Sequence, residues 1–169
     1  MGHYSVIKML ADSGYDMNIP LQGQITPLML AAKERRAFGI VQHMVRSGAE
    51  INTISEVGQT ALSLSIANQD RELSEFLLKN NANSFWIGPN AEESPFFTAI
   101  KLERIWAVEL MCDHGEDISE IKLNNMSALM YAATKGFDDI CMYLTLRVGK
   151  KDINQDHPAT GKNIFFVYL

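Results

Sequence analysis

The sequence predicts an all-α fold, a solenoid in which short helix-turn-helix units stack and project loops to one side. The segment Thr26-Pro27-Leu28-Met29-Leu30-Ala31-Ala32 returns in looser form after steps of 34, 34, 33 and 36 residues, starting at Thr60, Ser94, Ser127 and Asn163. A second series with a similar period consists of Gly14, Gly48, Asn81, Gly115 and Gly149. Two offset series with one period are typical of a repeat protein.

The first series predicts helix starts. A Thr or Ser hydroxyl accepts a hydrogen bond from an otherwise unpaired amide, and Pro27 and Pro95 stand at the first helical position, where a missing N–H is harmless. The second series predicts helix ends, because glycine adopts the left-handed conformation that stops a helix, and Asn81 also tolerates it. Each period therefore predicts a helix, a tight turn, a second helix, a stop and a loop.

The first helix of each unit carries a buried stripe at positions i, i+3 and i+4. The middle position is always small, which lets neighbouring helix pairs pack closely. The stripes are Leu28, Ala31 and Ala32; Leu62, Ser65 and Ile66; Phe96, Ala99 and Ile100; Leu129, Ala132 and Ala133. Helices of roughly ten residues are marginal alone, so their stability must come from the stack.

These boundaries divide the chain into repeats of one domain. We expect a partial repeat over residues 1–24, with a second helix and its loop, and repeats over 25–58, 59–92, 93–125 and 126–160. Residues 161–169 are expected to form the first helix of a further, truncated repeat.

The repeat resembles the ankyrin repeat over nearly the whole chain. Thr26-Pro27-Leu28-Met29-Leu30-Ala31-Ala32 is similar to the family's Thr-Pro-Leu-His-x-Ala-Ala, and Ser47-Gly48-Ala49-Glu50-Ile51-Asn52 resembles its Gly-Ala-Asp-Val-Asn ending. The family's histidine is replaced in four units and its inter-helix glycine in three. The replacements are Met29, Ser63, Phe97 and Met130 for histidine, and Arg35, Gln69 and Glu103 for glycine. The units are therefore expected to be degenerate and less stable than consensus ones.

The two ends of the sequence match parts of a repeat. Gly2-His3 resembles the pair that precedes the family's second helix, and the last residues resemble a first helix. Solenoids cover their ends with polar capping repeats, and neither end resembles one. We therefore expect a piece of a longer protein, whose uncovered ends could pack against another surface.

Composition limits the partners and the compartment. With 47% hydrophobic and 21% charged residues and no long apolar run, the chain is expected to be globular and not inserted in a membrane. Its formal charge of −5, from 15 Lys+Arg and 20 Asp+Glu, disfavours binding to nucleic acid. Cys112 and Cys141 fall in neighbouring second helices and are expected to be buried thiols of a reducing compartment. The expected location is the cytoplasm, with the nucleus as an alternative.

The sequence offers no arrangement suited to catalysis. The four histidines, His3, His43, His114 and His157, lack metal-ligand spacing. Thr160-Gly161-Lys162 matches part of a phosphate loop, but Asp156 stands where the first glycine is required. Paired acids such as Glu92-Glu93 fall in loops or at helix starts, whereas acid–base work needs buried, opposed groups. We expect no enzymatic activity, no cofactor and no metal site.

The resemblance implies a concave groove beside the first helices as a binding surface for proteins. The groove residues expected from their position are Lys33, Glu34, Ala67, Asn68, Lys101, Leu102, Thr134 and Lys135. The three lysines could attract an acidic partner. The alternative is that all eight are ordinary solvated helix residues.

The loops, which project as fingers in ankyrin proteins, carry apolar residues at their expected tips. These are Ile19, Pro20, Leu21, Ile54, Trp86, Ile87, Ile121 and Leu123. If exposed, they form an apolar ridge for a partner, with Trp86 as the strongest anchor. The alternative is that neighbouring fingers pack together and bury them.

The predicted function is a non-catalytic module that binds another protein through its groove and fingers. The rival hypothesis is a regulatory module that restrains another domain of the same, longer protein. The fold leaves the identity of the partner open, because unrelated proteins use the same stack.

Overall fold

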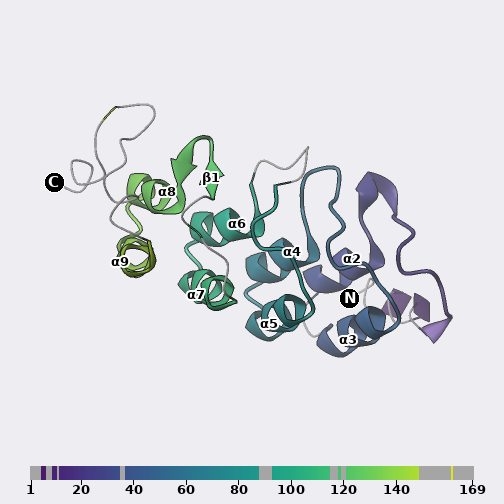
Figure 1. The fold of residues 1–169 in the computed structure, drawn as a ribbon. Helices are drawn as coiled ribbons and strands as arrows, with labels where there is room; N and C mark the ends of the chain where they lie inside the picture. Colours follow the sequence, from purple (N-terminus) through teal and green to yellow (C-terminus); the bar gives the residue numbers. More distant parts are fainter. Residues whose placement is uncertain are drawn as a thin grey trace. The chain divides into compact units, whose positions relative to one another are not determined.

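The computed structural model describes residues 5–6, 9–10, 12–34, 37–87, 93–114, 118, 121–148 and 161. The chain divides into two compact units, residues 1–98 and 99–169. The first contains η1 (Gln22–Gln24), α2 (Pro27–Lys33), α3 (Phe38–Arg46), α4 (Ala61–Ala67) and α5 (Arg71–Lys79). Helix α6 (Pro95–Lys101) spans the boundary. The second unit continues with α7 (Ile105–Asp113), β1 (Lys122–Leu123), β2 (Met126–Ser127), α8 (Ala128–Lys135) and α9 (Asp138–Arg147) (Figure 1).

The predicted helix starts at Thr26, Thr60, Ser94 and Ser127 are confirmed. The Thr26 Oγ1 accepts a hydrogen bond from the Met29 amide at 3.3 Å, and the Ser127 hydroxyl accepts one from the Met130 amide at the same distance. Thr60 and Ser63 form a capping box: the Thr60 Oγ1 accepts a bond from the Ser63 amide, and the Ser63 Oγ accepts one from the Thr60 amide. Ser63 stands in place of the family's histidine. Local sequence alone therefore sets where these first helices begin.

In the first unit, helices α2 and α4 pack side by side, and α3 and α5 pack beneath them as the second helix of each pair (Figure 1). The small stripe positions are confirmed as the seam, since Ala31 and Ser65 are both fully buried. The Ser65 hydroxyl donates to the Leu62 carbonyl and also lies 2.8 Å from the Ser74 Oγ of α5. A polar side chain is tolerated in this core because its hydrogen bonds are satisfied.

The turn between the two helices of a pair requires a left-handed residue. Gly136 takes this conformation at φ 74° between α8 and α9, whereas Gln69 and Glu103 take it at 59° and 56°. The amide of each of these residues donates a hydrogen bond to the carbonyl three residues earlier, in the first helix of its pair. Two repeats therefore have a residue with a Cβ at a turn position where glycine is favoured.

The second unit contains a small hairpin that helix signals alone did not predict. β1 pairs antiparallel with β2, with Leu123 opposite Met126. The two residues of its loop, Asn124 and Asn125, have φ values of 51° and 65°. Two left-handed residues in a two-residue loop make a type I′ turn, the geometry that suits a tight hairpin.

Several predictions lie outside the described residues. They include the stops at Gly115 and Gly149, the inter-helix position Arg35, His3, His157, and the last helix start at Asn163.

Candidate interaction surface

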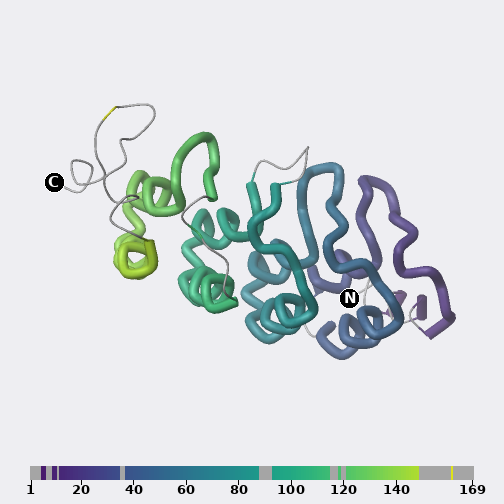
Figure 2. Tube along the Cα trace, in the orientation of Figure 1, coloured from purple at the N-terminus to yellow at the C-terminus, as the bar shows by residue number. Residues whose placement is uncertain are grey.

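The first loop of the first unit is held by its own backbone. The Leu21 amide donates to the Ile25 carbonyl at 2.8 Å, and Gly23 turns the chain at φ 78°. The Glu56 amide of the next loop donates to the Gly23 carbonyl at 2.9 Å, which ties the two loops together where they run side by side (Figure 2). Ile19 and Leu21 are nevertheless exposed, at 46% and 45%.

The second loop ends in a tight turn that presents a residue not foreseen from the sequence. The Gly58 amide donates to the Ser55 carbonyl at 2.9 Å, and Ser55 is buried. Val57 lies at the outer corner of this turn and is 70% exposed. The signal in the sequence was Gly58, whose φ of 80° marks a turn directly after the valine.

The third loop positions Trp86 through one asparagine. The Asn83 Oδ1 accepts hydrogen bonds from the amides of Phe85 at 3.0 Å and Trp86 at 2.8 Å. The Phe85 ring packs against Phe96 with centroids 4.9 Å apart, while Trp86 is 50% exposed. The indole is therefore presented by a fixed backbone rather than buried with its neighbour.

We call Ile19, Leu21, Val57 and Trp86 the fingertip ridge. Among the other predicted tips, Pro20 is exposed, whereas Ile54, Ile87 and Ile121 are half-buried. For Leu123 the alternative of a buried tip holds, because this side chain is only 6% exposed. It lies on the inward face of the β1–β2 hairpin, which packs against α8.

Some of the predicted groove residues are exposed and others are half-buried. Lys33, Lys101 and Lys135 are exposed, as are Ala67 and Thr134, whereas Glu34 and Leu102 are half-buried. The Lys135 Nζ lies 5.7 Å from the centre of the Tyr131 ring.

Asn68 joins two repeats. Its side-chain amide donates to the carbonyls of Ala32 and Lys33, at 3.1 and 2.6 Å, which connects the end of α4 to the end of α2. These bonds fix the asparagine within the stack, and a partner would have to compete with them.

Two asparagines that the sequence analysis did not single out also connect repeats. Asn18 accepts from the Glu50 amide at 2.7 Å and donates to the Gly48 carbonyl. Asn52 repeats the arrangement one unit later, accepting from the Asn83 amide at 2.7 Å and donating to the Asn81 carbonyl at 2.9 Å. Asn18 and Asn52 are 34 residues apart, and this repeat spacing could have indicated their shared role in the sequence.

Ionisable groups gather between α7 and α9, where they bind each other. Arg147 pairs with Asp113, and its guanidinium lies 5.2 Å from the Tyr143 ring centre. Burial raises the pKa of the Cys112 thiol from 9.0 to about 11, against the opposing effects of Arg147 and Tyr143. Burial likewise raises the pKa of Tyr143 to about 12. Both groups therefore stay protonated at neutral pH. This fits a role in packing between α7 and α9 rather than a reactive thiol.

The described residues offer neither a metal site nor a membrane span. Among them, no group of three or more His, Cys, Asp or Glu side chains lies close enough to hold a metal ion. None of the helices in these ranges is both long and apolar enough to cross a membrane. His43 and His114 are exposed. Cys112 and Cys141 are buried thiols outside any disulfide, as expected.

Comparison with known proteins agrees with this architecture. A family model described as ankyrin repeats (3 copies) matches residues 1–86 and 28–122. The chain belongs to the ankyrin repeat family. Ankyrin repeats are generally non-catalytic modules for protein–protein interaction, so a protein partner is expected of this chain as well.

The curated relatives are long proteins that share one stretch with this chain. Neurogenic locus notch homolog protein 1 of Homo sapiens is 30% identical over 91 residues, covering 54% of this chain and 4% of that protein. Ankyrin repeat and KH domain-containing protein mask-1 of Caenorhabditis elegans is 35% identical over 83 residues, covering 48% of this chain and 3% of that protein. The chain therefore spans only a few per cent of the length of these relatives.

Proposed function

We propose that this chain is a non-catalytic module that binds one partner protein through the fingertip ridge and the predicted groove residues. The observation that carries the proposal is the exposure of four large apolar side chains on three successive loops. Monomeric proteins rarely expose such groups together unless they bind something. The repeats would act inside the cell, in the cytoplasm or nucleus, which suits two buried cysteines that are not joined in a disulfide.

The loops are held in place before binding. The Glu56 amide bonds to Gly23, and Asn52 and Asn83 connect the second and third loops. A preorganised surface loses less conformational freedom when a partner docks. Trp86 is the expected anchor, because tryptophan dominates binding energy in many interfaces. In the first unit, Lys33, Glu34 and Asn68 would contribute groove contacts, and Ile54 and Ile87 would flank the tips. In the second unit, the corresponding contacts would come from Lys101, Leu102, Lys135 and Ile121.

Site-specific photo-crosslinking tests the surface and identifies the partner in one experiment. A benzophenone amino acid in place of Val57 is expected to capture a partner in cells, because the side chain points outward and tolerates enlargement. The same group in place of Arg71, exposed on α5, is the matched control and should not capture that protein. Equal capture at both positions would refute the ridge as the binding surface.

Affinity with the captured partner then tests Trp86. Trp86→Ala is expected to weaken binding by at least about 2 kcal/mol, and a loss below about 1 kcal/mol would remove it from the anchor class. The crosslink also separates the rival function. A crosslink to another segment of the same full-length chain would favour an intramolecular regulatory module, and one to a different protein would favour a binding module.

A further inference from the structure

Charged residues of the first unit are divided by sign between its loops and its helices. The three segments that hold the loops, residues 12–26, 47–60 and 80–94, each contain two Asp or Glu residues and no Lys, Arg or His. The described Lys and Arg residues of this unit are instead in helices α2, α3 and α5, at Lys33, Arg46, Arg71 and Lys79. The repeat does not require acidic loops, because the segment between α7 and α8 contains Lys122.

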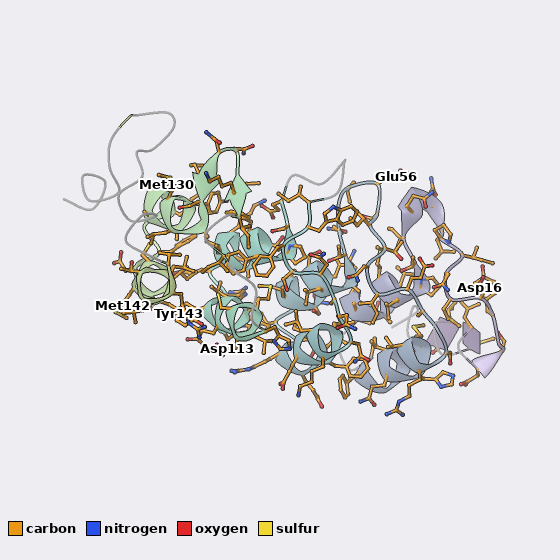
Figure 3. The ribbon with its side chains drawn as sticks, in the orientation of Figure 1. Asp16, Glu56, Asp113, Met130, Met142 and Tyr143 are labelled. Atoms are coloured by element: carbon orange, nitrogen blue, oxygen red, sulfur yellow. The ribbon has the colours of Figure 1, made fainter. Side chains whose placement is uncertain are left out.

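Glu56 lies among the apolar tips of the first two loops. It directly precedes the exposed Val57, and its amide is bonded to the Gly23 carbonyl in the turn that follows Leu21. Figure 3 shows Glu56 at the outer end of the second loop. A partner segment that covers the apolar side chains at this point therefore also meets the Glu56 carboxylate.

Glu50 adds a second carboxylate at the start of the second loop. Its amide donates to the Asn18 Oδ1 at 2.7 Å, and Asn18 is followed by the exposed Ile19. Asp16 lies farther from the outer ends of the loops than Glu56 does (Figure 3), and its Oδ1 already accepts a hydrogen bond from the Asn18 amide at 2.9 Å. Negative charge therefore lies beside the apolar side chains of both loops.

The two glutamates are available to a partner. Both are exposed, and among the described residues neither carboxylate accepts a hydrogen bond or forms an ion pair. Exposed charges of one sign attract partners of the opposite sign and repel those of like sign, such as nucleic acid and anionic membranes. The half-exposed indole of Trp86 favours the same partner, because a tryptophan ring binds apolar groups and also Lys or Arg cations over its face.

Resting on the proposed function, we propose that the partner docks on the fingertip ridge with a basic, apolar segment. Its Lys or Arg side chains lie against Glu50 and Glu56, and its large apolar side chains cover Val57 and Trp86. Lys33, the predicted groove lysine of the first unit, lies at the end of α2 and outside the loops, so the loops keep their acidic character.

Short random peptides displayed on phage and selected on the immobilised full chain test the chemistry of the partner. At about 0.15 M salt, the enriched peptides are expected to combine large apolar residues with a net positive charge. Enriched peptides that are apolar but neutral, or that are acidic and so match the groove lysines, would overturn this inference and leave the proposed function standing. A selection that enriches no peptide would also overturn it, while the photo-crosslink at Val57 still tests the proposed function on its own.

A synthetic copy of the most enriched basic peptide then tests the position of the carboxylates. Glu56→Lys is expected to weaken its binding at least about fivefold, mainly through slower association, with a smaller effect at high salt. Glu72 is exposed in the first turn of α5, away from the loops. Glu72→Lys changes the net charge by the same amount and should weaken binding less than about twofold. Circular dichroism checks that the variants fold, and Glu50→Lys should act in the same direction as Glu56→Lys.

Val57→Ser separates this inference from the proposed function. It should speed dissociation of the peptide, because it removes apolar contact rather than charge. Equal losses for Glu56→Lys and Glu72→Lys would overturn the inference, since net charge alone would explain them. A loss for Val57→Ser without one for Glu56→Lys would do the same while supporting the ridge as the binding surface. No loss for either ridge variant would overturn both proposals.

Discussion

Replacing Gln69 by glycine is expected to stabilise the protein by about 0.5 to 1 kcal/mol. Gln69 holds φ 59° between α4 and α5, where a residue with a Cβ loses about 1 to 2 kcal/mol to steric conflict. Glycine escapes this conflict but gives up about 0.5 to 1 kcal/mol to its greater freedom in the unfolded chain. The difference is the expected gain, since the Gln69 amide bond to the Ile66 carbonyl at 3.0 Å is kept.

The reciprocal change tests the same reasoning in the second unit. Gly136 has φ 74°, and an added Cβ would meet no atom within 4 Å. Gly136→Gln therefore introduces the backbone conflict without a packing clash and should lower stability by a similar amount.

Urea unfolding followed by circular dichroism measures both changes as shifts in midpoint at constant slope. Gln69→Ala is the control, because it shortens the side chain but keeps the Cβ, so its stability should stay close to that of the wild type. A gain for alanine equal to that for glycine, or a Gly136→Gln variant as stable as the wild type, would refute the explanation from backbone conformation.

Three other substitutions or conditions probe the ties between and within repeats. Asn52→Ala removes the bonds to Asn81 and Asn83, which should lower the free energy of unfolding by about 1 to 2 kcal/mol in urea, and an unchanged midpoint would contradict this. Because burial raises the pKa of Cys112 from 9.0 to about 11, the unfolded chain loses this proton first, and stability should fall as pH rises between those values. Cys112→Ser should remove that part of the decline; a decline of equal size in the variant would exclude the thiol as its source. Asn125→Gly at φ 65° should stabilise the hairpin by about 0.5 kcal/mol, and thermal unfolding at a lower temperature would argue against the type I′ turn.

The parts of the fold that the sequence predicted are those set by neighbouring residues. A hydroxyl at Thr26 reaches an amide three residues on, so the helix start is visible in a short window. The small residues at Ala31 and Ser65 recur because every unit packs against a near-copy of itself, and the period reports that contact. The family was predictable for the same reason.

The exposure of particular loop residues was less predictable, because it depends on turns and on contacts between repeats. Val57 and Leu123 illustrate this in opposite directions. Val57 follows a polar stretch and lies at a turn that projects it, whereas Leu123 sits in a hairpin whose register directs it inward. Asn68 was expected in the groove from its position at the end of α4, yet its bonds cross to the previous repeat. A single repeat contains no signal for such a partner.

The same cross-repeat bonds explain how a stack with unfavourable turns can still present a defined surface. Gln69 strains the turn before α5. The adjacent Asn68 bonds to the end of α2 and so holds that turn against the previous repeat. Between the same two repeats, Asn52 fixes the backbone at Asn83, which in turn holds the amide of Trp86. The departures at Gln69 and Glu103 therefore lower the stability of their repeats, while polar bonds between repeats keep the loop backbones in register. Because a repeat array is stabilised by its interfaces as much as by its repeats, the backbone that carries the exposed indole stays fixed even though the turns beneath it are not ideal.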